Sequence, residues 1–575
     1  MIRISMAIVP NHRWRLPLSS PVEIQNLIRE TRVAPLIALL LYQRGCRTPE
    51  AVKEFLNPSP AWLNKPDTLP DIGIATERII TAIDRKEPLL VYGDYDVDGV
   101  CGTALLVSVL KSLGGKVYYY LPHRESEGYG LSSGGLEFAL LNNIRLIITN
   151  DCGSNDIAVI KRAQSEGVDV IVTDHHETGP EYPPAVAFVN PKRMDSGYPF
   201  PELAGVGVAF KLAWSLLAAS GRKKEELVSL LDLVGLGTLA DVVPLIGENR
   251  IIARFGLVAL SRSKRPGIRA LIETSGLRGK NLSTRDVNFI LAPRLNAAGR
   301  VGHARMALKL LLTESFEEAI GLAERLEELN RFRQKMEEAI LAEAIGEVEK
   351  RRLDEERVIV LARRGWSVGV VGIVAARLVE RFWRPAIVIS LEEEIGKGSG
   401  RSINNFNLYQ ALRATQGYLV TFGGHRYAAG LKIRPEMLEP FTRAINEFAR
   451  GLPDEIFEPT LHIEAVIDLE EIDENFLRFF AQFEPFGPDN PEPVFVSKGV
   501  EVVGYPRRVG REHLKFKVRA NSAVFPAIAW KRSSDLLNLQ VGKPGHLDIC
   551  YTVKTDYFKG RKSVQLNILD LATQQ

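Results

Sequence analysis

The sequence predicts a multidomain α/β protein that ends in a small β-barrel, and three observations carry this prediction. With 575 residues, the chain is too long for a single hydrophobic core. From residue 88 onward, short apolar runs alternate with helix-like stretches, which is typical of a parallel sheet covered by helices on both faces. The last part of the chain alternates polar and apolar positions between turn residues, as the strands of a small barrel do.

Composition changes divide the chain into five predicted segments. Frequent prolines mark an irregular, partly helical lead-in, and the predicted parallel sheet follows it. The stretch 316–352 has no proline and is rich in Glu, Ala, Leu and Arg, so we expect one long, amphipathic connecting helix. A linker of proline and acidic residues precedes the barrel. The segments are the lead-in at 1–70, the sheet domain at 71–305, the connecting helix at 306–355, a second α/β domain at 356–452 and the barrel at 456–575.

Charge, hydropathy and cysteine spacing exclude several classes of protein. The formal net charge of +3 is close to neutral, so a nucleic-acid surface would have to be a local basic patch. No apolar run approaches the ~18–20 residues that cross a bilayer, and the N-terminus lacks the pattern of a signal peptide. The four cysteines lie far apart without a CxxC pair, which argues against a disulfide framework and a zinc site. We therefore expect a cytoplasmic protein that does not contact a membrane.

Acidic residues follow three of the predicted strands. Because ligands bind outside the carboxyl ends of the strands in an open parallel sheet, these residues should converge on one edge. Carboxylates that lie close together repel each other and need a compensating cation. Oxygen ligands with one or two imidazoles suit Mn²⁺ or Mg²⁺ better than Zn²⁺ or Cu²⁺. The runs that end at Tyr92, Thr149 and Thr173 lead into Asp94, Asp151 and Asp174-His175-His176, respectively.

The segment DYDVDG, which spans residues 94–99, is ambiguous when it is taken alone. A calcium-binding EF-hand loop begins in the same way, but its twelfth position requires Glu, and Leu105 stands there. Capping of the following helix is an alternative explanation for one of the three aspartates. The neighbouring strand ends make capping a poor explanation for all three together with Asp151.

Four motifs together resemble those of the DHH phosphoesterase family. They are DYDVDG at 94–99, NDCG at 150–153, TDHH at 173–176 and LADVVPL at 239–245. The resemblance implies two divalent cations, Mn²⁺ or Mg²⁺, which together can activate a water and stabilise both oxygens of a phosphodiester displacement. It further implies that His176 faces the scissile phosphate and that Asp174 orients the imidazoles. The implied metal ligands are Asp94, Asp96, Asp98, Asp151, His175 and Asp241.

Glycine- and arginine-rich motifs downstream resemble the DHH-associated domain of the RecJ-type exonucleases in this family. They are APRLNAAGR at 292–300, GSGRS at 398–402 and GGHRYAAG at 423–430. Glycine lets a backbone N–H approach an anion, and Arg pairs with two phosphate oxygens at once. Either glycine motif alone is weak evidence, because many such loops are only tight turns.

The same resemblance implies roles for individual residues of these motifs. Arg124, Ser399 and Arg401 are expected to hold the 5′-terminal phosphate, while hydrogen bonds that join the two domains are an alternative role for Arg300 and His303. Ser367 stands where many relatives carry His, so no imidazole acts at that position. The further DNA-binding candidates are Ser402, Arg300, His303 and Asn296, and the expected catalytic set is His176, Asp174, His425 and Arg294.

The barrel carries basic residues interleaved with aromatic ones, after a segment, PFGPDNPEPVF at 485–495, that again resembles the RecJ pattern. Cations that follow the backbone and rings that stack on bases are the features of a single-strand-binding OB-fold. A solvated basic strand face is the alternative. The expected DNA-binding residues are Arg507, Arg508, Arg511, Lys515, Lys517, Phe516 and Trp530.

The resemblance as a whole implies an exonuclease that degrades single-stranded DNA in the 5′→3′ direction to mononucleotides, in recombination and repair. The direction comes from the resemblance alone. It also implies a single-strand-binding protein and a RecQ-type helicase as partners of a monomer, and no further domain after the barrel. The alternatives are an oligonucleotide or cyclic-dinucleotide phosphodiesterase, which the barrel argues against, and a non-catalytic single-strand-binding scaffold, which the complete carboxylate set argues against.

Overall fold

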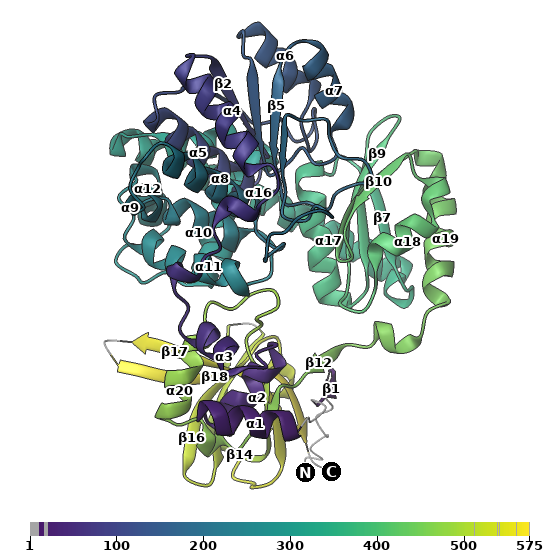
Figure 1. The fold of residues 1–575 in the computed structure, drawn as a ribbon. Coiled ribbons are helices and arrows are strands. Elements are labelled where there is room, and N and C mark those ends of the chain that lie inside the picture. Colours follow the sequence, from purple (N-terminus) through teal and green to yellow (C-terminus); the bar gives the residue numbers. More distant parts are fainter. Residues whose placement is uncertain are drawn as a thin grey trace. The chain divides into compact units, whose positions relative to one another are not determined.

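The chain divides into two compact units (Figure 1). In this computed structural model, residues 11–16, 21–510, 512–537, 539, 541–558 and 561–573 are described. The larger unit comprises Ser59–Phe457, and the smaller unit combines Met1–Pro58 with Glu458–Gln575. The smaller unit is therefore built from two segments that lie far apart in the sequence.

A five-stranded parallel sheet forms the first half of the larger unit. Its strands are β2 (Pro88–Gly93), β3 (Lys116–Tyr120), β4 (Leu146–Asn150), β5 (Asp169–Thr173) and β6 (Ala187–Val189). They lie in the order β3-β2-β4-β5-β6 and all run parallel. Because β3 and β4 lie on opposite sides of β2, the strand order reverses there. The carboxyl ends of β2 and β4 therefore border the position at which such sheets bind ligands.

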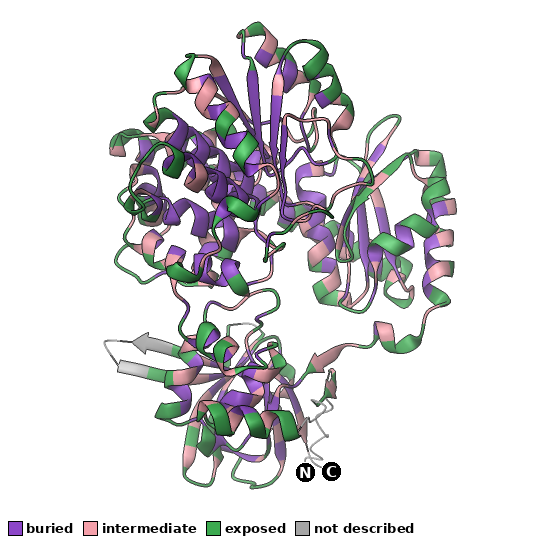
Figure 2. Ribbon diagram, viewed as in Figure 1, coloured by how far each residue is buried: buried purple, intermediate pink, exposed green. Residues whose placement is uncertain are grey.

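Alternate residues of the central strands pack on opposite faces of this sheet, as the twofold period of a strand requires. Leu89 and Val91 belong to one core, whereas Leu90 and Tyr92 belong to another. The buried strands between two helical layers confirm the predicted parallel sheet (Figure 2). Helices α4 (Ile72–Asp84), α5 (Val97–Ser112) and α8 (Gly205–Ala219) cover the first face, and α6 (Ser133–Leu141) and α7 (Ile157–Ser165) cover the second.

The predicted long connecting helix is confirmed as α16 (Phe316–Arg351), which has 36 residues. Ser315 begins it, since its side chain accepts a hydrogen bond from Glu318 N–H. Its apolar stripe belongs to two cores: Ala319, Ala323 and Leu326 pack with the parallel-sheet half, and Ile340, Ala344 and Val348 with the second half. Before it lie α9 (Glu225–Val228), α10 (Leu231–Ala240), α11 (Gly247–Ser261), α12 (Pro266–Thr274), α13 (Thr284–Asp286), the π-helix η3 (Val287–Leu291), α14 (Ala292–Val301) and α15 (Arg305–Leu312).

The second half of the larger unit is a mixed sheet. Its order is β10-β11-β9-β8-β7, in which β7 and β8 are parallel and the other neighbours antiparallel. Its strands are β7 (Ile359–Arg364), β8 (Ala386–Leu391), β9 (Gly396–Arg401), β10 (Thr421–Gly424) and β11 (Ala428–Ile433). Its helices are α17 (Val368–Phe382), α18 (Leu408–Ala414) and α19 (Leu438–Arg450). Helices α16 and α17 pack on one face, and α18 and α19 on the other.

The smaller unit contains the predicted barrel, with the strand pairing of an OB-fold. Five strands close on themselves through an antiparallel pair, β14 with β17, and a parallel pair, β16 with β18. The barrel strands are β14 (Phe495–Val509), β15 (His513–Ala520), β16 (Ala523–Ala529), β17 (Leu547–Phe558) and β18 (Arg561–Thr573), with β13 (Ala465–Val466) added beside β14 and helix α20 (Glu474–Phe480) before it.

The N-terminal segment completes the core of this barrel unit, which the sequence analysis did not predict. Leu27, Leu41 and Phe55 share one apolar core with barrel residues, and the rings of Phe55 and Phe483 lie 5.3 Å apart between centroids. Strand β1 pairs in parallel with β12. The elements are β1 (Arg13–Arg15), α1 (Pro21–Thr31), α2 (Pro35–Gln43), α3 (Pro49–Leu56) and β12 (Thr460–His462).

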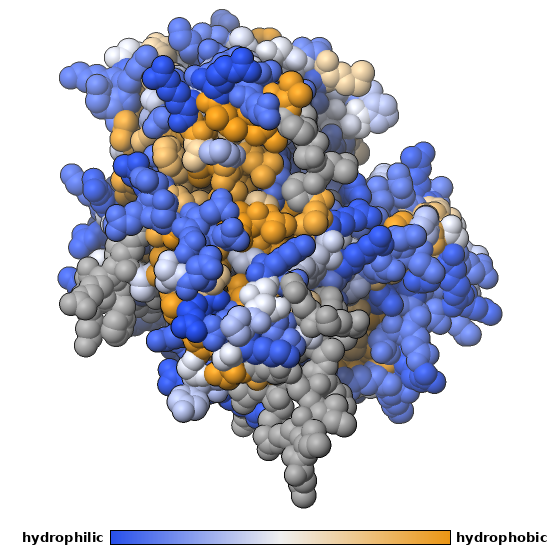
Figure 3. Space-filling model, turned by 90° about the horizontal axis from the view of Figure 1, so that it is seen from below, coloured by the Kyte–Doolittle hydropathy of each residue, from blue (hydrophilic) through white to orange (hydrophobic). Residues whose placement is uncertain are grey.

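None of the helices in the described part of the chain is long and apolar enough to span a membrane. Figure 3 shows one face of the molecule, on which hydrophilic residues surround an area of apolar ones.

Short 3-10 helices complete the fold: η1 (Pro60–Trp62), η2 (Pro66–Thr68), η4 (Leu353–Glu355), η5 (Gln416–Tyr418), η6 (Pro435–Met437), η7 (Asp454–Phe457), η8 (Leu469–Glu471), η9 (Ala481–Phe483) and η10 (Ser533–Leu537).

Asp570 of β18 ties the N-terminal segment to the barrel. Its buried carboxylate accepts hydrogen bonds from Asn11 N–H at 3.1 Å, His12 N–H at 3.0 Å and the Trp14 indole N–H at 3.0 Å. It also pairs with Arg532. Although burial works in the opposite direction, these donors lower the pKa of Asp570 to about 2.

Replacing Asp570 by Asn should destabilise the smaller unit, because an amide cannot accept all of these bonds and leaves the buried Arg532 with Asp535 as its remaining carboxylate partner. We expect the free energy of unfolding of this unit to fall by about 3 kcal/mol at pH 7, measured by calorimetry of the intact chain. The exposed Glu474→Gln is the matched control. The folded pKa lies below the unfolded value of about 3.9, so the stabilisation is present above pH ~4 and disappears as the pH falls towards 2. Equal stability of the Asn variant and the wild type at pH 7 would contradict this role.

Candidate metal centre and phosphate pocket

The carboxylates at the sheet edge are positioned by the backbone ladder. Asp94 N–H donates to Asn150 O at 3.3 Å, and Asp151 N–H donates to Thr173 O at 3.1 Å. Asp94 and Asp151 therefore both lie at the carboxyl edge of the sheet, each directly after its own strand. Asp151 has a φ of 64°, in the left-handed region that a residue with a Cβ enters at a cost of roughly 1–3 kcal/mol. This conformation turns the chain sharply at the strand end that the sequence analysis nominated.

Helix N-termini fix two further carboxylates. Asp96 caps α5 by accepting a hydrogen bond from Gly99 N–H at 3.1 Å. Asp98 accepts from Gly205 N–H at 2.7 Å and Val206 N–H at 2.9 Å, at the beginning of α8. The positive end of a helix dipole partly offsets the negative charge at each of these positions. Both side chains are thereby held in one orientation.

Glycine makes room for these carboxylates. A Cβ at Gly205 would lie 2.7 Å from Asp151 Oδ1, and one at Gly237 would lie 2.9 Å from Asp98 Oδ1. Both distances are shorter than a real contact, so a side chain at either position would displace the carboxylate.

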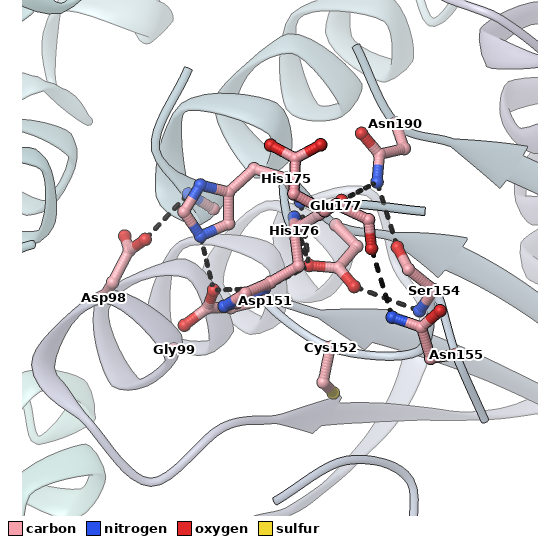
Figure 4. A network of polar contacts seen from close by, with 12 residues as sticks. Asp98, Gly99, Asp151, Cys152, Ser154, Asn155, His175, His176, Glu177 and Asn190 are labelled. Carbon is pink, nitrogen blue, oxygen red and sulfur yellow. Dashed lines mark hydrogen bonds and ion pairs between the residues drawn. The ribbon is translucent and has the colours of Figure 1, made fainter. Parts of the chain in front are cut away.

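All six predicted ligands converge. Their potential ligand atoms form three overlapping groups, within each of which the atoms lie no more than 4.8 Å apart. His175 Nε2 is 3.1 Å from Asp151 Oδ1 (Figure 4). The same nitrogen is 3.8 Å from Asp241 Oδ2. The groups are Asp94, Asp96 and Asp151; Asp98, His175 and Asp241; and Asp151, His175 and His176.

The chemistry of this cluster fits a hard divalent cation. Asp94 Oδ1, Asp151 Oδ1, Asp241 Oδ2 and His175 Nδ1 are buried and lack a hydrogen-bond partner within the described ranges. Burial and the charge of neighbouring Asp96 raise the pKa of Asp94 to about 8. Burial and His176 lower the pKa of His175 to about 4, despite the opposing charge of Asp241, so its imidazole is neutral, the form that binds metals. Cations would satisfy the unpaired oxygens and remove the repulsion.

Asp174 directs its carboxylate away from this cluster and orients His176. Its Oδ1 accepts hydrogen bonds from His175 N–H at 2.7 Å and from His176 Nδ1–H at 2.8 Å, and its Oδ2 accepts from Ser154 N–H at 3.0 Å. Although burial opposes it, the contact with Asp174 raises the pKa of His176 to about 9. Cys152 is buried, and its sulfur points away from both imidazoles (Figure 4).

The sequence analysis missed one residue of this centre, Tyr129. Its hydroxyl lies 2.9 Å from His176 Nδ1 and donates to Asp151 O at 3.0 Å. The flanking Gly128 and Gly130 have φ values of 83° and 95°, which let the loop bring the ring to the metal centre. A tyrosine between two glycines was the signal available in the sequence.

Three of the predicted arginines form a cluster, here called the arginine pocket, whose charges act on one another and on Asp94 and Asp96 of the metal centre. Burial and repulsion from Arg124 and Arg401 lower the pKa of Arg300 to about 9. Arg401 donates to Ser399 Oγ at 2.9 Å, and Arg300 donates to Gly369 O at 3.1 Å. In the part of the chain that is described, none of the three arginines pairs with a carboxylate. Uncompensated positive charge of this kind favours an anion.

The structure places other predicted residues elsewhere. Arg294 forms an ion pair with Glu327 at 2.7 Å, which links α14 to α16. His303 faces the ring of His123 at 5.9 Å between centroids. Both residues therefore lie outside the carboxylate cluster.

The remaining candidates of the larger unit differ in their surroundings. Ser402 donates to Phe406 O at 2.8 Å and so stabilises its own turn. Asn296 is half-buried on α14. His425 lies on the turn between β10 and β11. The charges of His176 and Asp241 act on its imidazole, so His425 is on the side of the metal centre.

The basic residues predicted on the barrel are exposed or half-buried where the structure describes them, and one predicted aromatic residue is not. Arg507, Arg508 and Lys517 are exposed and Lys515 is half-buried. Lys515 and Lys517 lie on the face of β15 opposite to the core, and Arg507 pairs with Lys515 across β14 and β15. The stacking role predicted for Phe516 is wrong, because β15 alternates and turns this ring into the barrel core. Arg511 lies outside the described residues.

Two aromatic side chains are exposed near these basic residues. Trp530 is 49% exposed and packs edge-on against His513, with centroids 4.6 Å apart. Tyr505 is 97% exposed, within the irregularity of β14 between Val503 and Arg507. The sequence analysis missed Tyr505, whose exposure depends on this bulge.

A carboxylate and imidazole cluster at the switch point of a parallel sheet, next to an arginine pocket, defines a metal-dependent phosphoesterase. Comparison with known families gives three matches: the DHH family, N-terminal domain, at residues 88–238; the DHHA1 domain at 355–451; and the RecJ OB domain at 463–570. The chain belongs to the RecJ family of DHH phosphoesterases, and its enzymatic class is that of a metal-dependent exonuclease.

Individual relatives agree with this assignment. The single-stranded-DNA-specific exonuclease RecJ of Bacillus subtilis is 39% identical over 570 residues, 98% of this chain and 71% of the relative. The same enzyme of Thermus thermophilus is 33% identical over 561 residues, 97% of this chain and 78% of the relative. The crystal structure of RecJ from Thermus thermophilus with Mn²⁺ has a TM-score of 0.82 at 31% identity, covering 98% of this chain and 80% of that one. A second structure of that protein contains Mg²⁺, with a TM-score of 0.76.

Replacing Gly205 by Ala should weaken metal binding without unfolding the sheet, because the new methyl group displaces the Asp151 carboxylate. We expect the affinity for Mn²⁺, measured by calorimetric titration, to fall roughly tenfold or more. Gly207→Ala, two residues further along the same helix, is the control, since its Cβ would lie 3.4 Å from the side chain of Leu203. Unchanged Mn²⁺ binding in the Gly205 variant would show that Asp151 is not a ligand.

Proposed function

We propose that this chain degrades single-stranded DNA from the 5′ end and releases mononucleotides, in recombination and repair. The observation that carries the proposal is the pocket of Arg124, Arg300 and Arg401 beside the metal centre. A terminal phosphate carries more negative charge than an internal phosphodiester, so a pocket of uncompensated arginines selects a strand end. Selection of an end is what distinguishes an exonuclease from an endonuclease.

The side chains of the metal centre have separate tasks in this proposal. Divalent cations, when bound, neutralise the carboxylates and polarise the scissile phosphodiester. The raised pKa of His176 keeps its imidazole protonated at neutral pH, so it can donate a hydrogen bond to a phosphate oxygen. Asp174 fixes the orientation of that ring, and His425 approaches from the β10–β11 turn. The proposed ligands are Asp94, Asp96, Asp98, Asp151, His175 and Asp241.

The arginine pocket and the barrel supply the remaining contacts to DNA. Ser399 and Gly372 line the pocket beside Arg401, where a Cβ at Gly372 would lie 2.8 Å from Ser399 Oγ. We assign the terminal phosphate to Arg124, Ser399 and Arg401, supported by Arg300. On the barrel, the DNA-binding candidates are Arg507, Arg508, Lys515, Lys517, Trp530 and Tyr505.

The proposed setting follows from the DNA substrate. We place the protein in the cytoplasm, acting as a monomer on single strands. A RecQ-type helicase would generate such strands, and a single-strand-binding protein would cover them.

Digestion of end-labelled single strands with Mn²⁺ or Mg²⁺ tests the proposal. The label of a 5′-labelled strand should appear at once as a mononucleotide, whereas a 3′-labelled strand should shorten progressively. Asp98→Ala should reduce both reactions to background, because it removes a carboxylate from the centre. Release of the 3′ label first would contradict the direction, and full activity of Asp98→Ala would contradict the metal assignment.

Removal of the smaller unit should separate hydrolysis from the binding of long strands. The deletion must take both residues 1–58 and 458–575, because α1–α3 would otherwise expose the apolar surface that packs on the barrel. We expect residues 59–457 to hydrolyse short strands at a similar kcat and to bind long strands about tenfold more weakly or worse, in line with the energy of base stacking. Equal binding of a long strand by the intact and the shortened chain would refute the role of the barrel.

A further inference from the structure

The loop of residues 121–132, between β3 and α6, contributes a side chain to each of two functional sites. Arg124 belongs to the arginine pocket, and its guanidinium lies over the ring of Tyr95 at 4.9 Å from the centroid. Tyr129 contacts His176 Nδ1 at 2.9 Å in the metal centre. Only four residues of one loop therefore separate the side chains that belong to the two sites.

Glu127 lies between these two residues and holds both sides of the loop. Its Oε2 accepts a hydrogen bond from His123 N–H at 2.6 Å, next to Arg124. Its Oε1 accepts from the Tyr120 hydroxyl at 2.9 Å and from Ser132 Oγ at 2.7 Å. Although burial works in the opposite direction, these hydrogen bonds lower the pKa of Glu127, so the carboxylate stays charged and accepts all three.

The far side of the loop has further anchors. Tyr92 donates to Gly130 O at 2.8 Å and accepts from Ser132 N–H at 3.1 Å. Asp156 accepts from Leu131 N–H at 2.6 Å. These bonds fix residues 130–132 on the sheet. Among the described contacts, those of Glu127 are the ones that connect this fixed side to the part of the loop that carries Arg124.

We propose that Glu127 is a positioning residue that couples recognition of the strand end to the metal centre. Glu127 fixes the position of Arg124 relative to Tyr129 within the loop. A terminal phosphate bound to Arg124 then stabilises the loop conformation in which Tyr129 orients His176. This inference rests on the proposed function. Its consequence is kinetic: a 5′-phosphate raises kcat as well as lowering KM, because it acts on the orientation of a group at the reacting phosphate.

The test compares full-length wild type, Glu127→Ala and the control Glu125→Ala on short single strands that carry either a 5′-phosphate or a 5′-hydroxyl. Glu125 is exposed in the same loop and carries the same charge. For the wild type we expect kcat to be higher with the phosphate. For Glu127→Ala we expect kcat on the phosphorylated strand to fall about tenfold and the ratio of the two kcat values to approach one. Glu125→Ala should retain both wild-type values.

Each outcome decides the inference. A variant that merely contains less folded enzyme loses activity by the same factor on both strands, and an unchanged ratio of kcat values overturns the proposal. A change confined to KM also overturns it. A wild type without end preference overturns the proposed function and this inference with it, whereas a preference that survives in Glu127→Ala overturns the inference alone.

Glu127→Gln keeps the test decisive if the alanine variant does not fold. The side-chain oxygen of Gln can still accept hydrogen bonds from Tyr120 and Ser132. Its NH₂ group is a donor, however, and cannot accept the hydrogen bond from His123 N–H. We expect the ratio of kcat values to lie between those of the wild type and Glu127→Ala. A wild-type ratio in this variant would show that the bond to His123 does not position Arg124.

Discussion

The repulsion among buried carboxylates at the ends of β2 and β4 is the constraint around which the larger unit is organised. Asp94, Asp96, Asp98 and Asp151 can share one small volume only when positive charge lies among them. The N-terminus of α8 supplies part of this charge to Asp98, and glycine at position 205 allows the close approach. The remaining charge has to come from metal ions, so the folded sheet edge and the bound cations stabilise one another.

The convergence of the strand-end carboxylates could be predicted from the sequence pattern, whereas the full ligand set with Asp96, Asp98 and Asp241 came from the resemblance of the motifs. Asp94 and Asp151 directly follow parallel strands, and the period of a parallel sheet brings such positions together without further information. Tyr129 and Glu127 could not be predicted in the same way, since their roles depend on the path of an irregular loop. Phe516 lies in a regular strand but was assigned to the wrong face. Because side chains alternate along a strand, an offset of one residue exchanges a surface position for a core position.

Helix α16 explains how the parallel-sheet half and the mixed-sheet half of the larger unit can share one site. One face of the helix enters the core of each half, so the two halves have a common structural element and not merely a common surface. Arg300 lies on α14 of the parallel-sheet half. Its guanidinium donates a hydrogen bond to Gly369 O on α17 of the mixed-sheet half. The arginine pocket can therefore combine residues from both halves in a defined geometry.

The contribution of α1–α3 to the barrel core has a consequence for the order in which the chain folds. Residues 21–56 leave the ribosome before the larger unit does, but the strands that complete their core end at residue 573. The larger unit is complete at residue 457 and can fold while synthesis continues. During that time the first three helices present apolar surface without its partner. The core that α1–α3 share with the barrel is therefore completed only after the whole of the larger unit has been synthesised.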